Sequence, residues 1–237
     1  MNQWLNYKGL KCIILCAGEG TRLIPTTLKK PKVMIQIGNR PILEYVINYW
    51  RKYTNDFVFI VKFKKEEVIE FVNQLPINCQ FVEQKELKGI ADAILYAKDL
   101  VLDRFIVVLG DCICRGDFNF PLHMEQGIGV WKTQDMGTIR QSYSLEIRHG
   151  FVSHVKEKPK KVYNDLCGMG FYFFSKKVFD YIALTEPSYL RGEIEITDTI
   201  QKMIDHGEKI SPVFFEGNYL NITYPEDLIR AEKSLFS

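Results

Sequence analysis

The chain has 237 residues, of which 46% are hydrophobic and 25% are charged, a composition typical of a globular protein with one sizeable core. Its 31 Lys and Arg residues against 29 Asp and Glu residues leave a formal net charge of +2 without any basic block, so nucleic acid is not expected as a partner. We recognise neither a secretory signal nor a run of about 18 apolar residues, which predicts a cytoplasmic protein that does not enter a membrane.

Six cysteines are spread along the chain, at positions 12, 16, 79, 112, 114 and 167. Without a secretory signal, cysteines are typically reduced, and we interpret most of these as small buried hydrophobic residues. Cys112 and Cys114 lack a second cysteine pair or paired histidines at ligand spacing, so no zinc site is expected there.

The first half of the chain alternates apolar runs rich in Ile, Val and Phe with helical patterns. Strands are predicted at 11–16, 57–61, 79–83 and 105–109, and helices at 41–51, 65–74 and 89–100. Pro41 is expected to open the first helix, whose apolar positions form one stripe. The repeated β-α-β order predicts an α/β fold: an open, Rossmann-like, mixed but mainly parallel sheet with helices on both faces.

The second half shows shorter β-like pieces and three further helical patterns. Strands are predicted at 128–132, 143–148, 152–156, 168–174 and 210–215, and helices at 176–184, 195–206 and 225–236. No linker rich in Gly, Ser or Pro separates the halves. We therefore expect one domain over residues 1–237, with a soft boundary near residue 115 between a larger and a smaller lobe.

A glycine-rich segment follows the first predicted strand, and it reads Leu15-Cys-Ala-Gly18-Glu-Gly20-Thr-Arg22-Leu-Ile-Pro25, ending at Pro31-Lys32. Glycines at such a place let backbone N–H groups turn inward and bind phosphate oxygens. The segment is neither a P-loop, since no Gly-Lys-Ser/Thr follows, nor a dinucleotide fingerprint, since Leu23 stands where the third glycine belongs. If the loop doubles back, Arg22 and Lys32 can both face one polyphosphate, as a nucleoside triphosphate requires.

This segment resembles the opening motif G-x-G-T-R-L-x-P-x-T-x-x-x-P-K of the sugar-1-phosphate nucleotidyltransferases, the pyrophosphorylases that make nucleotide sugars. The resemblance is greatest to the hexose-1-phosphate thymidylyl- and uridylyltransferases. It continues through most of the chain, in Gln84-x4-Gly89-Ile-Ala-Asp-Ala, Leu109-Gly110-Asp111, Glu157-Lys158-Pro159, Arg191-Gly-Glu-Ile-Glu-Ile-Thr-Asp198 and Tyr219-Leu-Asn221-x3-Pro225-Glu-Asp-Leu228. It implies a nucleotide-binding half over about residues 1–115 and a half that binds sugar phosphate and completes the metal site over about residues 116–237.

For the nucleotide, the resemblance implies that Arg22 holds the β- and γ-phosphates and Lys32 the α-phosphate. Gln84 and the backbone of Gly89 would read the base, because an amide offers both a donor and an acceptor to a pyrimidine imide edge. A solvent-facing Gln84 is the alternative. The remaining nucleotide-binding residues implied by the motif are Leu15, Ala17, Gly18, Glu19, Gly20 and Thr21.

For the metal, the resemblance implies that Asp111 binds Mg²⁺, a hard cation that prefers oxygen ligands. Many members of the family carry Asp at the position of Asn221, whose amide oxygen can still serve as the second ligand. The alternatives are a strand-ending Gly-Asp turn at Asp111 and a turn residue before Pro225 at Asn221.

For the sugar phosphate, the resemblance implies that Glu157 accepts bonds from sugar hydroxyls, Lys158 holds the phosphate and Gly170 lines the pocket. An exposed charged turn at Glu157 and Lys158, and a strand glycine for close packing at Gly170, are the alternatives.

The implied reaction joins a nucleoside triphosphate, with UTP or dTTP favoured, to a sugar 1-phosphate, and it releases pyrophosphate. Both substrates are small molecules, and a homo-oligomer is compatible with the resemblance. Three alternatives stay open: a glycosyltransferase that uses a nucleotide sugar, a regulatory subunit that senses nucleotide sugars without turnover, and a cytidylyltransferase for another phosphorylated acceptor.

Overall fold

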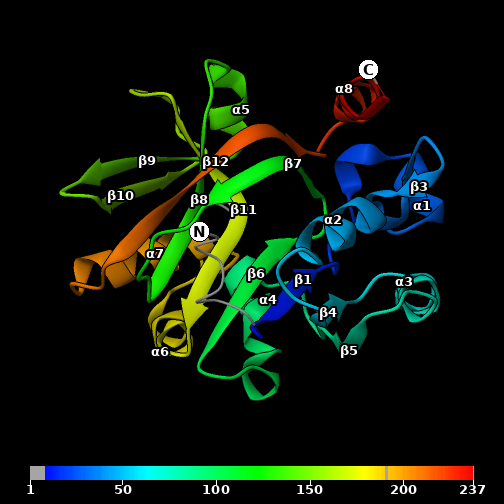
Figure 1. The fold of residues 1–237 in the computed structure, drawn as a ribbon, viewed down its shortest axis with the longest axis horizontal. Helices are drawn as coiled ribbons and strands as arrows, with labels where there is room; N and C mark the ends of the chain where they lie inside the picture. The colour runs from blue at the N-terminus through cyan, green and yellow to red at the C-terminus, as the bar shows by residue number, and fades with distance from the viewer. Residues whose placement is uncertain (1–8, 190–191, 237) are drawn as a thin grey trace.

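The computed structural model describes residues 9–189 and 192–236, whose strands form one open sheet of ten strands and a small hairpin (Figure 1). Along the main path of the large sheet the strands follow the order β5-β4-β1-β6-β11-β8-β12-β7, with β9 paired to β10 and β11. The strands are β1 (Lys11–Leu15), β4 (Asp56–Val61), β5 (Asn78–Glu83), β6 (Arg104–Leu109), β7 (Cys112–Asn119), β8 (Gln126–Lys132), β9 (Tyr143–Arg148), β10 (Phe151–Glu157), β11 (Leu166–Ser175) and β12 (Ile210–Asn221), with β2 (Gln36–Ile37) and β3 (Arg40–Pro41) in the hairpin.

The sheet is parallel on one side and mixed on the other. Strands β5, β4, β1 and β6 run parallel to one another, as β-α-β connections require. Beyond β6, strand β11 pairs antiparallel with both β6 and β8, and β12 runs parallel to β8 but antiparallel to β7. The predicted fold class, a mixed sheet of the Rossmann-like kind with helices on both faces, is confirmed.

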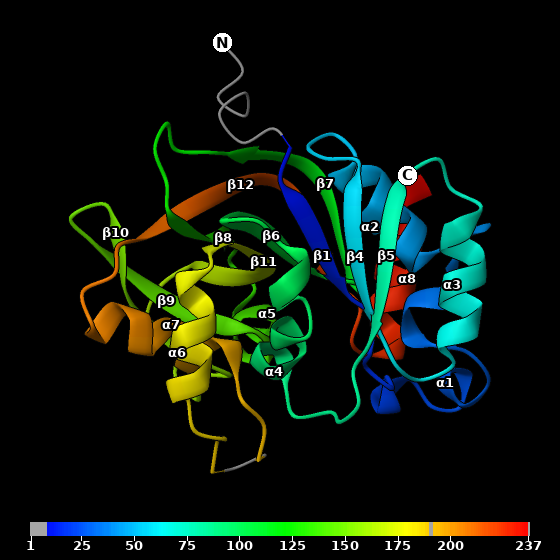
Figure 2. The same cartoon turned by 90° about the horizontal axis from the view of Figure 1, so that it is seen from below.

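Helices cover both faces of the sheet, as Figure 2 shows from below, with α2, α3 and α8 on one side and α4, α6 and α7 on the other. The helices are α1 (Thr26–Lys29), α2 (Ile42–Trp50), α3 (Lys65–Asn73), α4 (Ile90–Leu95), α5 (Met136–Gln141), α6 (Lys177–Leu184), α7 (Ile196–Asp205) and α8 (Pro225–Phe236), with 3₁₀ turns η2 (Thr21–Leu23), η3 (Lys32–Met34) and η4 (Lys98–Leu100). None of the helices in the described residues is both long and apolar enough to span a bilayer.

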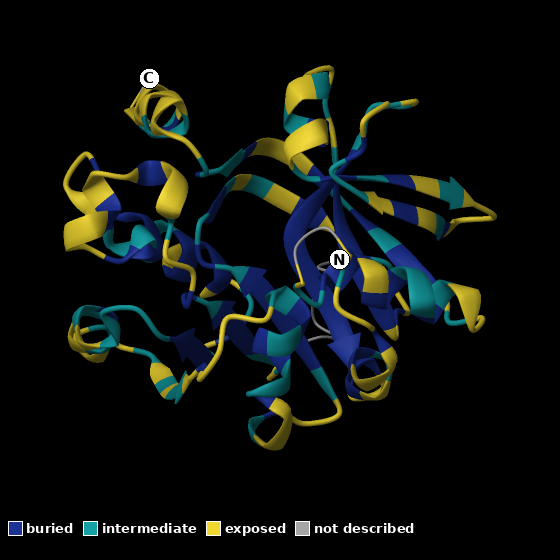
Figure 3. Cartoon of the chain, turned by 180° about the vertical axis from the view of Figure 1, so that it is seen from behind, coloured by how far each residue is buried: buried dark blue, intermediate teal, exposed yellow. Residues whose placement is uncertain are grey.

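Side chains along a strand point alternately to the two faces of the sheet, so each face has its own hydrophobic core. In β1, Cys12 and Ile14 join the core under α2 and α3, while Ile13 joins the core under α4, α6 and α7. Consecutive residues in the middle of β1, β4 and β6 are therefore buried, and Figure 3 shows the central strands in dark blue with exposed residues gathered on loops and outer helices. This pattern accounts for the continuous apolar runs in the sequence.

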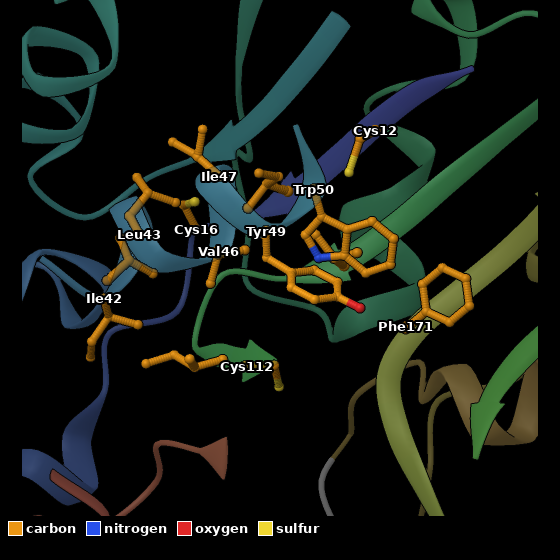
Figure 4. Packing of buried hydrophobic residues seen from close by; sticks show 14 of the residues in the cluster. Cys12, Cys16, Ile42, Leu43, Val46, Ile47, Tyr49, Trp50, Cys112 and Phe171 are labelled. Atoms are coloured by element: carbon orange, nitrogen blue, oxygen red, sulfur yellow. The ribbon is translucent and has the colours of Figure 1, made fainter. Parts of the chain in front are cut away.

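Helix α2 packs an aromatic side chain against a strand from the second half of the chain. Its buried positions include the predicted stripe, and Figure 4 shows Trp50 beside Phe171 of β11, with ring centroids 4.9 Å apart. Pro41 lies at the N-cap, one residue before the helix begins, because its extended ψ of 151° still belongs to the hairpin. A helix of the first half of the chain thus packs on a strand of the second half.

The predicted strands and helices within the described residues are present, with ends that shift by a few residues. The helix predicted at 89–100 is divided into α4 and η4, and the strand predicted at 210–215 continues to Asn221. Sequence patterns missed β7, whose polar residues suit its position at the edge of the sheet, and the six-residue helix α5. Residue 115 lies inside β7, so the two lobes share one continuous sheet.

Candidate active site

The glycine-rich loop begins where β1 ends, at the edge of the sheet where the parallel strands present their carboxyl ends. Its first residues continue the strand, because the Cys16 N–H donates to the Ile60 carbonyl oxygen at 2.8 Å. The loop then turns through η2 and α1 and returns at η3. The doubled-back loop predicted from the sequence is therefore present.

Gly20 is the point at which the loop closes on itself. Its φ of 65° is left-handed, and a Cβ there would lie 2.8 Å from the Cβ of Lys32. The Thr27 hydroxyl donates to the Gly20 carbonyl oxygen at 2.9 Å and fixes the turn. Only glycine fits both the backbone angle and the close approach, so Gly20 brings Lys32 beside the loop.

Lys32 and Asp111 form an ion pair across the end of the sheet. Asp111 follows β6, and the Lys32 ammonium contacts its Oδ2. Asn221, at the end of β12, lies beside them because it pairs with Cys112 in the β12–β7 register and the Ile222 N–H donates to the Asp111 carbonyl oxygen at 3.0 Å. The structure thus brings together two residues that are 110 positions apart in the sequence.

The side chains of Asp111 and Asn221 fit a magnesium ion by the chemistry of their donor atoms. They supply a carboxylate and an amide oxygen to one cavity, and Mg²⁺ usually takes one or two protein ligands while phosphate and water oxygens complete its octahedron. No group of three or more His, Cys, Asp or Glu residues in the described part of the chain could form an all-protein metal cage. The two oxygens therefore suit a metal that is shared with a phosphate substrate.

Arg22 lies in η2, exposed at the mouth of the site. Its guanidinium sits over the ring of Tyr224, with Cζ 5.8 Å from the ring centroid, and Tyr224 comes from the segment between β12 and α8. A guanidinium stacked on a ring keeps its N–H groups in the plane, where they can bind phosphate. The stack links the glycine-rich loop to the C-terminal segment.

Gln84 is buried, with 2% of its surface exposed, so the solvent-facing alternative is wrong. Its Nε2 donates to Asp92 Oδ2 at 3.0 Å. Gly89 has a φ of 105°, and a Cβ at this position would lie 2.5 Å from the Ile194 carbonyl oxygen. Glycine is required at position 89 because the 192–195 segment packs directly on this loop.

Glu157 and Lys158 line the same cavity at the end of β10. Lys158 Nζ lies 3.3 Å from Glu157 Oε1, and Thr197 donates to the other carboxylate oxygen at 3.3 Å. Lys158 has a φ of 40°, and its N–H donates to the Ser142 carbonyl oxygen at 2.8 Å. A left-handed lysine costs about 1–2 kcal/mol, which indicates that the surrounding structure holds this side chain in a specific direction.

Gly170 lies where the β11–β8 pairing shifts register, between Gly168 and Tyr172. Its N–H donates to the phenol oxygen of Tyr219 at 2.9 Å, and that oxygen lies 3.1 Å from Cys112 Sγ. A Cβ at Gly170 would meet Cys112 Sγ at 2.7 Å, so close packing contributes to the glycine requirement. Burial raises the pKa of the Tyr219 phenol, which therefore stays protonated.

Each residue that the sequence assigned to the site lines one cavity of about 480 Å³. Its wall includes residues of the glycine-rich loop, Gln84, Lys32, Asp111 and Lys158. The sequence-assigned residues on its wall are Leu15, Ala17, Gly18, Glu19, Gly20, Thr21, Arg22, Lys32, Gln84, Gly89, Asp111, Glu157, Lys158, Gly170 and Asn221.

Sequence reasoning missed part of the wall. Glu193, Glu195 and Tyr219 stand inside quoted motifs and could have been assigned from them, whereas Gln141 and Ser142 carry no motif at all. Arg191, the first residue of one quoted motif, lies outside the described residues. The remaining missed residues on the wall are Cys16, Val33, Leu87, Ile90, Ala93, Leu109, Tyr143, Tyr172, Ile196 and Thr223.

Thiols at the site are unsuited to nucleophilic chemistry. Burial raises the pKa of Cys16 and of Cys112 well above the usual value, and the neighbouring Asp111 carboxylate raises both further. Each of the six cysteines is a free thiol, and four are buried. What the cavity offers chemically is a set of cations, backbone N–H groups and carboxylate and amide oxygens.

Comparisons with known proteins identify the family. The bifunctional protein GlmU of Methanocaldococcus jannaschii is 34% identical over 229 residues, which are 95% of this chain and 54% of that protein, so the chain spans about half its length. The UTP–glucose-1-phosphate uridylyltransferase AglF of Haloferax volcanii is 31% identical over 237 residues, with 95% of this chain and 96% of that protein covered.

Among solved structures, a UDP-glucose pyrophosphorylase complexed with UDP-glucose superposes with a TM-score of 0.82 at 20% identity, covering 96% of this chain and 98% of that one. A family model described as nucleotidyl transferase matches residues 11–236. Because that match extends over nearly the whole chain, the protein belongs to the nucleotidyl transferase family.

Proposed function

We propose that the protein joins a nucleoside triphosphate, UTP or dTTP, to a sugar 1-phosphate and releases pyrophosphate. The observation that carries this function is the single cavity that is lined by Arg22, Lys32, Asp111 and Lys158. Two phosphate substrates repel each other, and three cations on the wall of one cavity offset that repulsion. The name of one relative, a UTP–glucose-1-phosphate uridylyltransferase, supports UTP with glucose 1-phosphate as the first pair to test.

In this reaction an oxygen of the sugar phosphate attacks the α-phosphorus in line. A P–O bond forms to the sugar phosphate, and the bond between the α-phosphorus and the bridging oxygen breaks, so that pyrophosphate leaves with its negative charge. No proton has to be removed from the nucleophile, because a phosphate monoester has a second pKa of about 6 and is largely dianionic at neutral pH. The rate then depends on positioning and on charge stabilisation.

Each charged residue has a separate task. Arg22 binds the β- and γ-phosphates and stabilises the departing pyrophosphate, and Lys32 binds the α-phosphate. Lys158 holds the incoming sugar phosphate, while Glu157 accepts bonds from sugar hydroxyls. The N–H groups of the Gly18–Gly20 turn bind phosphate oxygens.

Asp111 and Asn221 would hold Mg²⁺. When bound, the ion neutralises charge on the phosphate oxygens. Lys32 lies against Asp111, so its ammonium is held beside the carboxylate that would bind the ion.

A screen for pyrophosphate release tests the function. The purified chain is incubated with Mg²⁺, each of five nucleoside triphosphates and a panel of sugar 1-phosphates, and we expect pyrophosphate only when both substrates are present. Release of a nucleoside diphosphate from a nucleotide sugar instead would identify a glycosyltransferase, and binding of nucleotide sugars without turnover would identify a regulatory subunit.

Magnesium titration tests the metal ligands. Asn221→Ala removes one of two protein oxygens, so we expect the Mg²⁺ concentration for half-maximal rate to rise roughly tenfold, with partial rescue at high Mg²⁺. Asn218→Ala is the matched control, because Asn218 is an exposed residue of the same strand. An unchanged Mg²⁺ dependence in Asn221→Ala removes that residue from the metal site.

A further inference from the structure

Gln84, the residue that we assign to the nucleotide base, is hydrogen-bonded to the carboxylate of Asp92. Gln84 follows β5 and is 2% exposed, and its Nε2 donates to Asp92 Oδ2 at 3.0 Å. Gln84 lines the cavity, whereas Asp92 lies outside its wall, in the first turn of α4. Asp92 therefore contacts the Gln84 amide from outside the wall of the cavity.

An ionised carboxylate can only accept hydrogen bonds, so it selects one of the two orientations of the amide. The NH₂ group of Gln84 must face Asp92, because the flipped amide would place two oxygen acceptors against each other. Among the described residues no group donates to Gln84 Oε1, and this oxygen is not among the fully buried atoms that lack a partner. The amide oxygen and the second N–H are thus the groups left for a ligand in the cavity.

Both residues stand on rigid backbone. The Gln84 N–H donates to the Val61 carbonyl oxygen at 2.9 Å, and Lys62 Nζ donates to the Gln84 carbonyl oxygen at 3.2 Å. Helix α4 is tied down by the Ala91 N–H, which donates to the Ile194 carbonyl oxygen at 3.1 Å. These bonds fix the backbone of both partners, and the hydrogen bond from Gln84 Nε2 to Asp92 then sets the orientation of the amide.

We propose that Asp92 is a positioning residue that orients the Gln84 amide to accept a hydrogen bond from the N3–H of the base, and so selects uracil or thymine over cytosine. This inference rests on the proposed function. Uracil and thymine carry an N3–H donor next to a C4 carbonyl, which matches the free oxygen and the free N–H of Gln84. Cytosine carries an N3 acceptor next to an amino group and needs the opposite orientation, which Asp92 opposes.

The test compares kcat/KM for UTP and CTP in the wild type and in Asp92→Asn. An asparagine can face Gln84 with either its oxygen or its NH₂ group, so the amide becomes free to flip. We expect the wild type to prefer UTP and the variant to lose at least about tenfold of that preference, on the scale of one mispaired buried hydrogen bond. Asp99→Asn, an exposed acid in η4 just after the same helix, should keep the ratio.

Two further measurements test the role of Asp92 in base selection. Asp92→Ala removes the carboxylate without adding a donor and should also lower the UTP preference, which covers a failure of Asp92→Asn to fold. In the wild type, UTP methylated at N3 has lost the donor and should be used at least about tenfold less well than UTP.

The outcomes separate the two proposals. A wild type that releases pyrophosphate from UTP, combined with an unchanged UTP-to-CTP ratio in folded Asp92 variants, overturns the positioning role and leaves the function standing. A wild type that prefers CTP, or that uses N3-methylated UTP as well as UTP, also overturns it. If no nucleoside triphosphate gives pyrophosphate, the proposed function itself fails.

Discussion

The two walls of the cavity are built in different ways. The wall to which we assign the nucleotide, called the nucleotide wall below, comes from loops that leave the parallel strands β1, β5 and β6, whose carboxyl ends all meet at one edge of the sheet. The wall to which we assign the sugar phosphate, called the sugar wall, comes from the end of β10, the middle of β11 and the end of β12, which are linked through β9 and β8 by antiparallel pairings and by the parallel pairing of β12 with β8. Parallel topology brings its loops together automatically, whereas the sugar wall depends on the register of several strand pairs.

The walls also differ in charge. On the nucleotide wall, the exposed Arg22 stacks on an aromatic ring and Lys32 pairs with a carboxylate that we assign to the metal. On the sugar wall, Lys158 is paired with its own neighbour, Glu157. We infer that the nucleotide wall binds the more highly charged substrate, and that the sugar wall needs a carboxylate for hydroxyl groups as well as a cation for phosphate.

The largest expected effect tests whether the two walls belong to one cooperative unit. Trp50 of α2 stacks on Phe171 of β11 at 4.9 Å and on Phe118 of β7 at 5.6 Å. Trp50→Ala should lower the free energy of unfolding by about 3–5 kcal/mol, because it leaves a cavity in the core that joins both halves. Urea denaturation followed by circular dichroism should give one transition at a lower midpoint.

Leu102→Ala is the control for this core substitution. Leu102 is 71% exposed, so its truncation should change the free energy of unfolding by less than about 0.5 kcal/mol. Two separate transitions in the Trp50 variant would show that the halves unfold independently.

The next largest effect concerns catalysis on the nucleotide wall. Arg22→Ala removes the cation assigned to the leaving pyrophosphate, so kcat should fall by at least about a hundredfold, the scale for losing one charged stabiliser of a transition state. Steady-state kinetics with saturating substrates measure it, and Arg51→Ala, an exposed arginine at the C-cap of α2, should behave as wild type. A folded Arg22→Ala with normal turnover contradicts the assignment.

A smaller effect should separate the walls by substrate. Lys158→Ala should lower kcat/KM for the sugar 1-phosphate by roughly 10–100-fold, the range for a hydrogen bond to a charged group, with little change in equilibrium binding of the nucleotide. Lys160→Ala, an exposed lysine two residues away, is the matched control. Equal losses of affinity for both substrates would mean that Lys158 does not belong to the sugar wall alone.

The smallest expected effect lies where the glycine-rich loop meets the C-terminal segment. Tyr224→Ala removes the ring under Arg22, and KM for the nucleoside triphosphate should rise about two- to fivefold, because exposed cation–π pairs contribute about 0.5–1 kcal/mol. Tyr224→Phe keeps the ring and should retain the wild-type KM. A loss of the same size in Tyr224→Phe would point to the hydroxyl group instead.

Local features of the sequence were sufficient for the nucleotide wall. Gly18, Gly20, Arg22 and Lys32 lie within one short segment, and the β-α-β order already places that segment at the carboxyl edge of the sheet. The motif matches also assigned Glu157 and Lys158 to the sugar phosphate, with an exposed charged turn as the alternative. What the sequence pattern could not show is the left-handed φ of Lys158, which depends on the bond from its N–H to Ser142.

Long-range contacts decided the rest. Edge strand β7 was missed because Arg115, Gly116 and Asp117 interrupt its apolar residues, and its pairing with β12 is what sets Asn221 beside Asp111. Likewise, nothing local in the sequence indicates that Asp92 faces Gln84 or that Tyr219 binds the N–H of Gly170. Residue type and spacing determined which chemical groups this protein carries and which half of the fold presents them. Only the packed structure decided which groups meet, because strand register and side-chain orientation are set by the whole core rather than by neighbours in the chain.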